Sequence, residues 1–470
     1  MLHLAPLDIG VLIAYLAAVA ALVFSTKLRD HSLIQYLVAG RSLTLPAFVA
    51  TLVATWYGGI LGSGDFVKSF GVGNILLNGA PYYLFAILYA VWWAPRVRAA
   101  DQISIPERLH LRYGKGAALV GAGLIFLLAA PAAHTRMLAT LLNLATGWSL
   151  PISVAAAGLV GAAFLYRGGL LADVRASMLA FVMMYIGFVV LVATCMSQQP
   201  LGEVMAKLPA NIKSPTGGAG PLSILTFFAL GAWTLIDPGF HQRAVSAASP
   251  EVGRKGIFVC VLFWLLFDLL STTAGLYAFV RLPEAAGLSF FPLLGDLVLP
   301  TGLKGIFLAG LFGTILSATV GYTLVAGATF GREIVARIRP EFDDAKTKLW
   351  TRIGFVVSAL FAMALALAVQ NVAIDLWYAY AGAVTGAILP PLTLAYGKDR
   401  KIPGRVAAWA MALGFAVAVA WIVQARRTNN TYLNVKLLGE EFSLGTLVPG
   451  AMVSAGVLLL GTGLDRRKTG

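Results

Sequence analysis

Long apolar stretches recur along the whole chain of 470 residues, and they restrict what it can fold into. Most are close to or above the ~20 residues that a helix needs to cross a bilayer. A segment in lipid must satisfy its own backbone hydrogen bonds, so these stretches are expected to be helices. We expect an all-α polytopic membrane protein with about thirteen transmembrane helices, at residues 6–25, 46–71, 79–97, 115–145, 150–166, 172–197, 221–239, 255–281, 301–335, 348–369, 374–396, 404–424 and 445–463.

The placement of the basic residues predicts the orientation in the membrane. The chain is 59% hydrophobic and 12% charged, with a net charge of +14 that would suggest a nucleic-acid partner in a soluble protein. Here the connecting segments alternate in basic content, so we expect lipid and no nucleic acid as the partner. The rich segments should be cytoplasmic, which places the N-terminus on the extracellular or periplasmic side and the C-terminus in the cytoplasm of a multi-pass cell-membrane protein. The rich set holds Lys27, Arg29, Arg41 and the basic residues within 96–115, 167–175, 243–255, 332–352, 398–405 and 466–468, and the poor set holds Lys207, Lys213, Arg281, Lys304, Arg426, Arg427 and Lys436.

One predicted span contains four glycines within seven residues, in the segment 54–65. Glycine destabilises a helix, so this density is costly unless the helix is broken around a protein-lined cavity. Broken helices at mid-membrane expose backbone groups to ion and solute in secondary transporters. A GxxxG packing face from Gly58 to Gly62 is the alternative interpretation. The polar Ser63, Asp65 and Lys68 on the same segment favour the break.

A second interrupted span lies five spans later, at residues 231–239. Pro238 and Gly239 disturb a helix, and Asp237 precedes them. Two interrupted spans at corresponding positions indicate an inverted-repeat transporter with a core of five plus five helices. The predicted organisation is a peripheral helix and loop at 1–45, a first repeat at 46–197, a loop at 198–220, a second repeat at 221–396 and two peripheral helices at 397–470.

Several motifs occur in the order and spacing of a known family. They are Tyr36-Leu-Val-Ala-Gly-Arg-Ser-Leu43, the glycine-rich segment 54–63, Ser104-Ile-Pro-Glu-Arg-Leu-His-Leu-Arg-Tyr-Gly114, Gly168-Gly-Leu-Leu-Ala172, Gln242-Arg243 and Leu308-Ala-Gly-Leu-Phe-Gly-Thr-Ile-Leu-Ser317. With these motifs the chain resembles the sodium/solute symporter family, the relatives of bacterial proline, pantothenate and sugar symporters. The resemblance covers about residues 8–396 and implies the five-plus-five fold and cation-coupled solute uptake.

The resemblance also implies a sodium site between the first break and the eighth core helix. Its metal ligands would be backbone carbonyls of Ala54 and Tyr57 with oxygens from Thr314 and Ser317. A second family hydroxyl falls on Ala318, which has none. The family's Thr-Asp pair on the fifth core helix falls on residues 176–177, which are Ala-Ser, and Trp56 replaces an Asp found in some members. A hard cation needs several oxygens, so these departures leave a weaker, neutral cage.

Polar and aromatic groups near the two breaks are the candidate solute contacts: Trp56, Gly59, Ser63, Asp65, Lys68, Arg136, Trp233 and Asp237. Each has an alternative role. Asp65 and Lys68 share a helix face and could form a salt bridge with each other. Asp237 could cap a freed helix end, the two tryptophans could be packing only, and Arg136 could have a structural partner.

The depth of Asp268 and Asp173 in their predicted spans suggests their roles. Asp268 lies near mid-span, and it is either a proton or cation site or the partner of Arg136. Asp173 is expected to be solvated at the cytoplasmic interface.

We therefore expect a secondary active transporter and not an enzyme. It would import a small polar solute by alternating access, with sodium as the coupling ion and no other cofactor. Lys68 and Arg136 favour an anionic or zwitterionic solute. The alternatives are a transporter of the same fold that is proton-coupled or uncoupled, and a non-transporting receptor or scaffold. The oligomeric state is left open.

Overall fold

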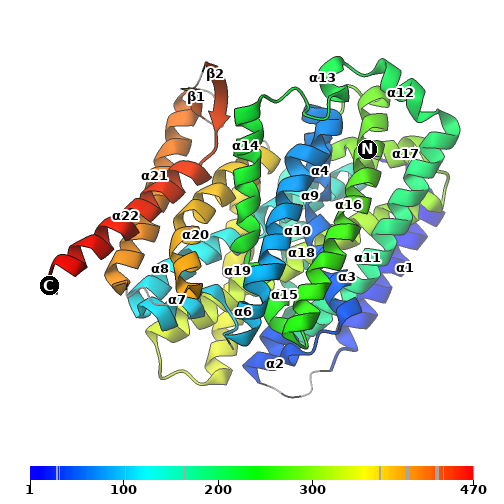
Figure 1. The fold of residues 1–470 in the computed structure, drawn as a ribbon. Helices are drawn as coiled ribbons and strands as arrows, with labels where there is room; N and C mark the ends of the chain where they lie inside the picture. The colour runs from blue at the N-terminus through cyan, green and yellow to red at the C-terminus, as the bar shows by residue number, and fades with distance from the viewer. Residues whose placement is uncertain are drawn as a thin grey trace.

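The computed structural model describes residues 1–27, 30, 32–100, 102–163, 165–369, 372–397, 402–428, 433–437 and 439–468. Arg29, Lys398, Arg400 and Lys401, which were expected in basic loops, lie outside these residues. Figure 1 shows a bundle of long helices between two faces. We call the face with the β1–β2 hairpin, α12 and α13 the upper face, and the face with α2 and α7 the lower face.

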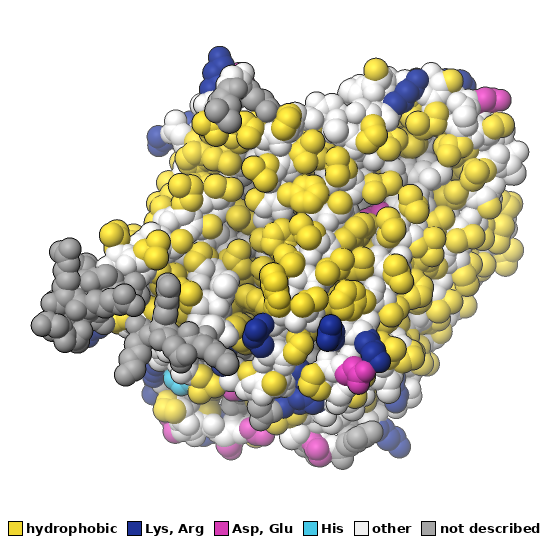
Figure 2. All heavy atoms as spheres, in the orientation of Figure 1, with side chains coloured by type: hydrophobic (Ala, Val, Ile, Leu, Met, Phe, Trp, Pro, Cys, Tyr) yellow, Lys and Arg dark blue, Asp and Glu magenta, His cyan; other side chains and the backbone are white. Residues whose placement is uncertain are grey.

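Within the described residues, nine helices are long and apolar enough to cross a membrane, and a bent helix pair makes a tenth. Two further expected spans appear as shorter apolar helices, at 150–162 and 447–461. The polytopic helical architecture is thereby confirmed, whereas the count of thirteen spans stays a prediction. The surface agrees with a bilayer: Figure 2 shows a broad band of hydrophobic side chains, with Lys and Arg gathered mainly along its lower edge.

The first half of the bundle follows the peripheral helix α1 and the short helices α2 and η1. Its first span is broken, as expected, into α3, the single turn η2, and α4. The bounds are α1 Pro6–Phe24, α2 Leu33–Val38, η1 Ala39–Arg41, α3 Leu45–Trp56, η2 Tyr57–Gly59, α4 Ile60–Phe70, η3 Gly71–Gly73, η4 Ile75–Gly79, α5 Ala80–Leu88, η5 Tyr89–Trp93, α6 Ala94–Ala99, α7 Ile105–Tyr113, α8 Lys115–Ala129, α9 Ala132–Thr146, α10 Leu150–Ala163 and α11 Leu165–Gln198.

The second half begins with the second broken span. Its expected end at residue 239 is wrong: a new helix begins at Pro238 and continues to Ser246, because Pro is favourable at a first helical position. The two pieces meet at a bend of 42°. The bounds are α14 Pro221–Leu230, η6 Gly231–Leu235, α15 Pro238–Ser246, α16 Pro250–Arg281, η7 Gly287–Ser289, α17 Phe290–Val298, α18 Leu303–Ala328, η8 Thr329–Ala336, α19 Asp344–Ala368, η9 Val372–Ala381 and α20 Gly382–Tyr396.

Several elements lie outside the predicted core. The predicted loop 198–220 holds two short helices, and the helix α17 and the β-hairpin were not predicted. The hairpin pairs its strands antiparallel, from Leu433 opposite Leu444 to Leu437 opposite Glu440. The bounds are α12 Leu201–Lys207, α13 Ala210–Lys213, α21 Gly404–Arg427, β1 Leu433–Leu437, β2 Glu440–Leu444 and α22 Leu447–Lys468.

The N-terminal segment is fixed to the start of α18. The Asp8 carboxylate accepts the backbone amides of Gly302 and Gly305, at 2.7 and 3.0 Å. The Asp296 carboxylate of α17 binds the Lys304 ammonium at 2.7 Å and the His3 backbone amide at 3.0 Å. These bonds tie α1, α17 and α18 together at the N-terminal end of α18.

Candidate functional site

The first break brings the backbone of η2 against α18. A Cβ added at Gly58 would lie 2.0 Å from the Ala318 Cβ, so this approach requires glycine. The Tyr57 carbonyl accepts the amide of Ile60, which leaves one of its two lone pairs free. The structure therefore places the break beside the helix that carries Thr314, Ser317 and Ala318, as the cation-site hypothesis requires.

The hydroxyls of α18 have partners that the sequence did not reveal. The Ser317 Oγ lies 2.6 Å from the Ser177 Oγ of α11, and both side chains are buried. The Thr314 hydroxyl donates to the Gly310 carbonyl at 2.7 Å, and its oxygen can still accept. Ser177 thus places a hydroxyl beside Ser317, next to the position where Ala318 lacks one.

The second break is organised by Asp237. Its Oδ1 accepts the Phe240 amide at 2.6 Å, which confirms that Asp237 caps the new helix. Its Oδ2 accepts the Tyr322 hydroxyl at 2.8 Å, and Tyr322 lies one turn beyond Ala318 on α18. Asp237 therefore connects the second break to the same helix that the first break contacts.

A central cavity of about 70 Å³ lies between the two breaks. Its walls are mainly aromatic: the Trp56 and Tyr82 rings meet edge to face at 4.9 Å, and the His134 ring stacks on Tyr322 at 5.1 Å. The His134 Nδ1 and the Trp233 Nε1 are buried without a hydrogen-bond partner in the structure, so both are available to a solute. The cavity is lined by Thr55, Trp56, Tyr57, Gly59, Ser63, Asn78, Tyr82, His134, Trp233, Tyr322 and Trp377.

Trp377 of η9 forms part of the lining of this cavity. Cβ atoms added at Gly59 and Gly62 would lie 2.7 and 2.4 Å from its ring, so the indole rests directly on the backbone of the broken helix. The indole ring also packs in a cluster with Phe66 and Leu230. These two side chains line a second, larger cavity of about 370 Å³. Trp377 therefore lines the central cavity and packs against two residues that line the second one.

The predicted solute contacts divide into two groups. Trp56, Gly59, Ser63 and Trp233 line the central cavity, whereas Asp65, Lys68, Arg136 and Asp237 do not. Asp65 lines the second, larger cavity instead. The lining of the central cavity, as described, contains no Lys, Arg, Asp or Glu.

Two ion pairs that were open as alternatives are not found. Lys68 donates to the Ala285 carbonyl at 2.6 Å, and no N–O contact within 4.0 Å joins it to Asp65 among the described residues. Arg136 donates to the Ala366 carbonyl at 2.9 Å and not to Asp268. In both cases a backbone carbonyl from a neighbouring segment satisfies the cation, which sequence spacing cannot predict.

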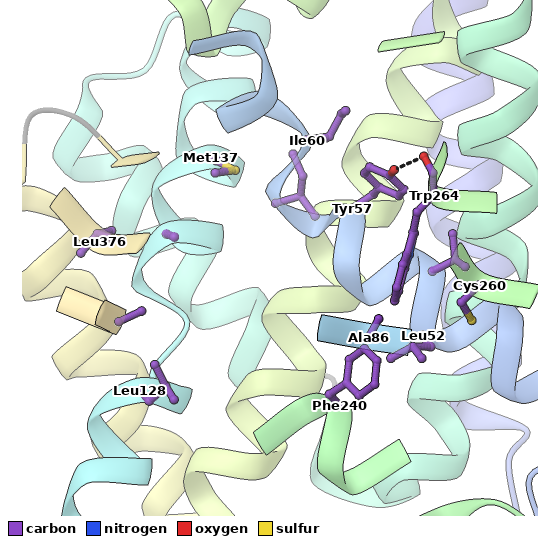
Figure 3. Packing of buried hydrophobic residues seen from close by; sticks show 14 of the residues in the cluster. Leu52, Tyr57, Ile60, Ala86, Leu128, Met137, Phe240, Cys260, Trp264 and Leu376 are labelled. Carbon is purple, nitrogen blue, oxygen red and sulfur yellow. Dashed lines mark hydrogen bonds between the residues drawn. The ribbon is translucent and has the colours of Figure 1, made fainter. Parts of the chain in front are cut away.

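Asp268 of α16 is held by tyrosines and not by arginine. The Tyr57 hydroxyl lies 2.9 Å from its Oδ1 and 2.7 Å from the Trp264 carbonyl, the contact drawn in Figure 3. The Tyr83 hydroxyl bonds its other oxygen. Figure 3 also shows Trp264 beside Tyr57 and Phe240 below them, so this part of the molecule is built from side chains of three spans. Asp268 therefore fixes the Tyr57 side chain, whose backbone belongs to the candidate cation site.

The expectation that Asp173 is solvated is also wrong. Its side chain is fully buried, and its Oδ2 accepts the Arg243 guanidinium at 2.8 Å. Arg243 also donates to the Thr55 hydroxyl at 3.1 Å and to the Gln242 amide oxygen at 2.9 Å. This ion pair contacts Thr55, the residue after Ala54. The sequence placed Asp173 near the end of a predicted span and gave no sign that it would be buried and paired.

Comparisons with known proteins identify the family of the chain. A model described as the sodium:solute symporter family matches residues 36–414. The chain is 20% identical to the sodium/glucose cotransporter 1 of Mus musculus over 88% of this chain and 71% of that protein. It is 22% identical to a sodium/mannose cotransporter of Bos taurus over 90% of this chain and 79% of that protein.

The fold resembles a solved structure over nearly all of its length. That structure is a substrate-bound, outward-open Na⁺-coupled sialic acid symporter, with a TM-score of 0.79, 14% sequence identity and 98% of both chains covered. At this identity the likeness concerns the fold.

Proposed function

This chain belongs to the sodium:solute symporter family, and we propose that it imports a small polar solute together with sodium by alternating access. The observation that carries the proposal is the aromatic cavity between two helix breaks, with one break in contact with α18. A solute site at the junction of broken helices is the arrangement by which inverted-repeat transporters alternate their access. The chain is accordingly a transporter and not an enzyme.

We place the coupling ion between the first break and α18. Its ligands would be the carbonyls of Ala54 and Tyr57 and the oxygens of Thr314 and Ser317. Ser177, 2.6 Å from Ser317, supports this assignment, because it brings a further hydroxyl to a site from which Ala318 removes one. Sodium prefers several oxygen ligands, by analogy with other hard cations. Proton-coupled and uncoupled transport are the rival mechanisms.

The size and lining of the cavity favour a small, neutral solute that can stack against aromatic side chains. Its walls offer rings for stacking and two unpaired hydrogen-bonding groups, His134 Nδ1 and Trp233 Nε1. An anionic or zwitterionic solute was expected from Lys68 and Arg136, but neither lines the cavity. The contacts of the cavity thus favour a neutral polar molecule.

The test has two stages. First, purified protein is screened by thermal shift against sugars, amino acids and organic acids, since a ligand that binds only the folded state raises the melting temperature. Second, uptake of the best ligand is measured in proteoliposomes with an inward sodium gradient and with choline in its place. We expect uptake to require sodium. Equal uptake in both buffers would favour the rival mechanisms, and binding without any uptake would favour a receptor.

A further inference from the structure

The buried ion pair between Asp173 and Arg243 has no role in the cation site described so far. We propose that Asp173 supplies the negative charge of that site, and that Arg243 is a tethered cation which competes with the coupling ion for it. This inference rests on the proposed sodium coupling. It assigns two residues, 70 apart in the chain, to the control of ion affinity.

The position of the pair follows from its contacts. The Arg243 Nη2 atom lies 2.8 Å from the Asp173 Oδ2 and 3.1 Å from the Thr55 hydroxyl. Thr55 directly follows Ala54, whose carbonyl is a candidate ligand. On the opposite side, a Cβ added at Gly321 would lie 2.8 Å from the same Nη2, so the guanidinium fills a space that α18 leaves open. Gly321 lies one turn beyond Ser317 on that helix.

Asp173 reaches the candidate ion site through a hydroxyl on its own helix. Asp173 and Ser177 are four residues apart on α11 and therefore share a face. The Ser177 Oγ lies 2.6 Å from the Ser317 Oγ. Asp173 and Ser317 also line one small cavity, which residues Tyr15, Val19 and Val23 of α1 close from outside. A path of oxygens thus leads from the carboxylate to the candidate ligand on α18.

The bonding of the pair is incomplete. The Asp173 Oδ1 and the Arg243 Nε are both buried without a hydrogen-bond partner in the structure. A buried polar atom without a partner costs free energy, so each group can gain from a further ligand. For a carboxylate oxygen, that ligand is a donor or a cation. Asp173 therefore has one oxygen held by Arg243, and its further polar neighbour is the Ser177 hydroxyl, which leads towards Ser317.

The charges explain why the two cations would compete. The other candidate ligands are neutral carbonyls and hydroxyls, and Asp173 is the carboxylate that Arg243 contacts beside them. A buried carboxylate is tolerated when a cation compensates it, and removing one partner of a buried pair is strongly destabilising. The guanidinium keeps its charge under all relevant conditions and repels a second cation nearby. An ion that enters must therefore share Asp173 with Arg243 or displace it.

Asp173 lies close to the position at which the resemblance described above implies a carboxylate. The family's Asp on the fifth core helix falls on Ser177, and Asp173 lies one turn earlier on the same face. One turn is a shift of about 5.4 Å along the helix axis. At that depth the carboxylate meets Arg243 of the second broken span. The carboxylate charge of Asp173 is thus placed where the Arg243 guanidinium can bind it.

The experiment measures how sodium raises the melting temperature of the full chain in detergent, with N-methyl-glucamine chloride keeping the ionic strength constant. In Arg243→Gln the carboxylate loses its internal cation, so half-maximal stabilisation should need about tenfold less sodium. In Asp173→Asn the uncompensated guanidinium repels sodium, so the requirement should rise about tenfold or the shift should disappear. The double variant Asp173→Asn/Arg243→Gln is neutral and should return towards the wild-type requirement.

The controls separate this inference from general loss of stability. The double variant Asp296→Asn/Lys304→Gln removes the ion pair that joins α17 to the N-terminal end of α18. It should leave the sodium requirement unchanged. If Arg243→Gln does not fold, Arg243→Lys keeps the charge but shortens the reach, and the sodium requirement should fall severalfold.

Two outcomes would overturn different claims. If sodium stabilises the wild type but the two single variants shift its requirement in the same direction, Arg243 does not compete with the ion and this inference is wrong. If sodium has no effect on the wild type while the solute still binds, sodium coupling itself is wrong, and the inference falls with it.

Discussion

At the scale of single residues, the cation site depends on where each oxygen is placed and not on how many the sequence contains. Ala318 lacks the hydroxyl that the resemblance would put there, and its methyl group instead packs on Gly58. Ser177 brings a hydroxyl from another helix to Ser317. The loss of one ligand on α18 is therefore accompanied by a replacement from α11.

We expect Ser317→Ala to raise the sodium concentration for half-maximal uptake about tenfold, which corresponds to roughly 1.4 kcal/mol of lost interaction. Ala318→Ser should lower it, because it restores an oxygen. The measurement is initial uptake rate against sodium concentration in proteoliposomes. Thr323→Ser, which keeps its hydroxyl farther along α18, is the matched control. Unchanged sodium dependence in Ser317→Ala would remove this residue from the site.

At the scale of elements, the two helix breaks were predictable and the contacts around them were not. Gly58, Pro238 and Gly239 act through their own backbone, so their effect can be read from the local sequence. Trp377 contacts Gly59 and Gly62, which lie far earlier in the chain. Asp173 and Arg243 are likewise distant in sequence, and no local pattern indicates such contacts. For the same reason, the local spacing of Asp65 and Lys68 predicted a pair that the structure does not contain.

Closure of the central cavity should depend on the glycines beneath Trp377. A methyl group at Gly62 would lie 2.4 Å from the indole, so Gly62→Ala should displace the ring and leave the cavity open from above. We expect slower uptake and faster labelling of a Ser63→Cys reporter by a water-soluble thiol reagent. Gly123→Ala, where a Cβ has no neighbour within 4 Å, is the control. Equal labelling rates in both variants would contradict a covering role for Trp377.

The contacts of α17 predict a pH dependence of stability. Burial raises the pKa of Asp296, but hydrogen bonds from Lys304 and His3 outweigh it and leave the pKa below its ordinary value of 3.8. A lowered folded pKa stabilises the fold above pH 3.8, and this contribution disappears as the pH falls through the lowered value. The melting temperature of Asp296→Asn should therefore differ less from wild type at pH 3 than at pH 7. A constant difference would show that the carboxylate charge has no stabilising role.

At the scale of the whole molecule, the fold class and the two broken spans followed from the sequence, because apolar length and interrupted spans are properties of the chain itself. The central cavity was predicted in part: Trp56, Gly59, Ser63 and Trp233 line it, but Tyr82, His134, Tyr322 and Trp377 were missed as contacts. These four come from other spans, and their packing around the breaks decides their role. The direction of insertion remains a prediction.

Accessibility labelling tests that direction. A cysteine at the exposed Glu284, on the loop before α17, should react with a membrane-impermeant reagent in intact cells. One at the exposed Asp344, on the lower face, should react only after permeabilisation. The native Cys195 and Cys260 are buried and should stay unlabelled. The reverse pattern would place the lower face outside the cell.

The aromatic lining of the central cavity has an optical consequence. Of the ten tryptophans in the chain, Trp56, Trp233 and Trp377 line this cavity. The emission of an indole changes in wavelength and intensity when its surroundings become more or less polar. A colourless, unlabelled solute that enters the cavity should therefore change the intrinsic fluorescence of the protein. Single Trp→Phe variants would then show whether the ring above the solute or the rings beside it move first.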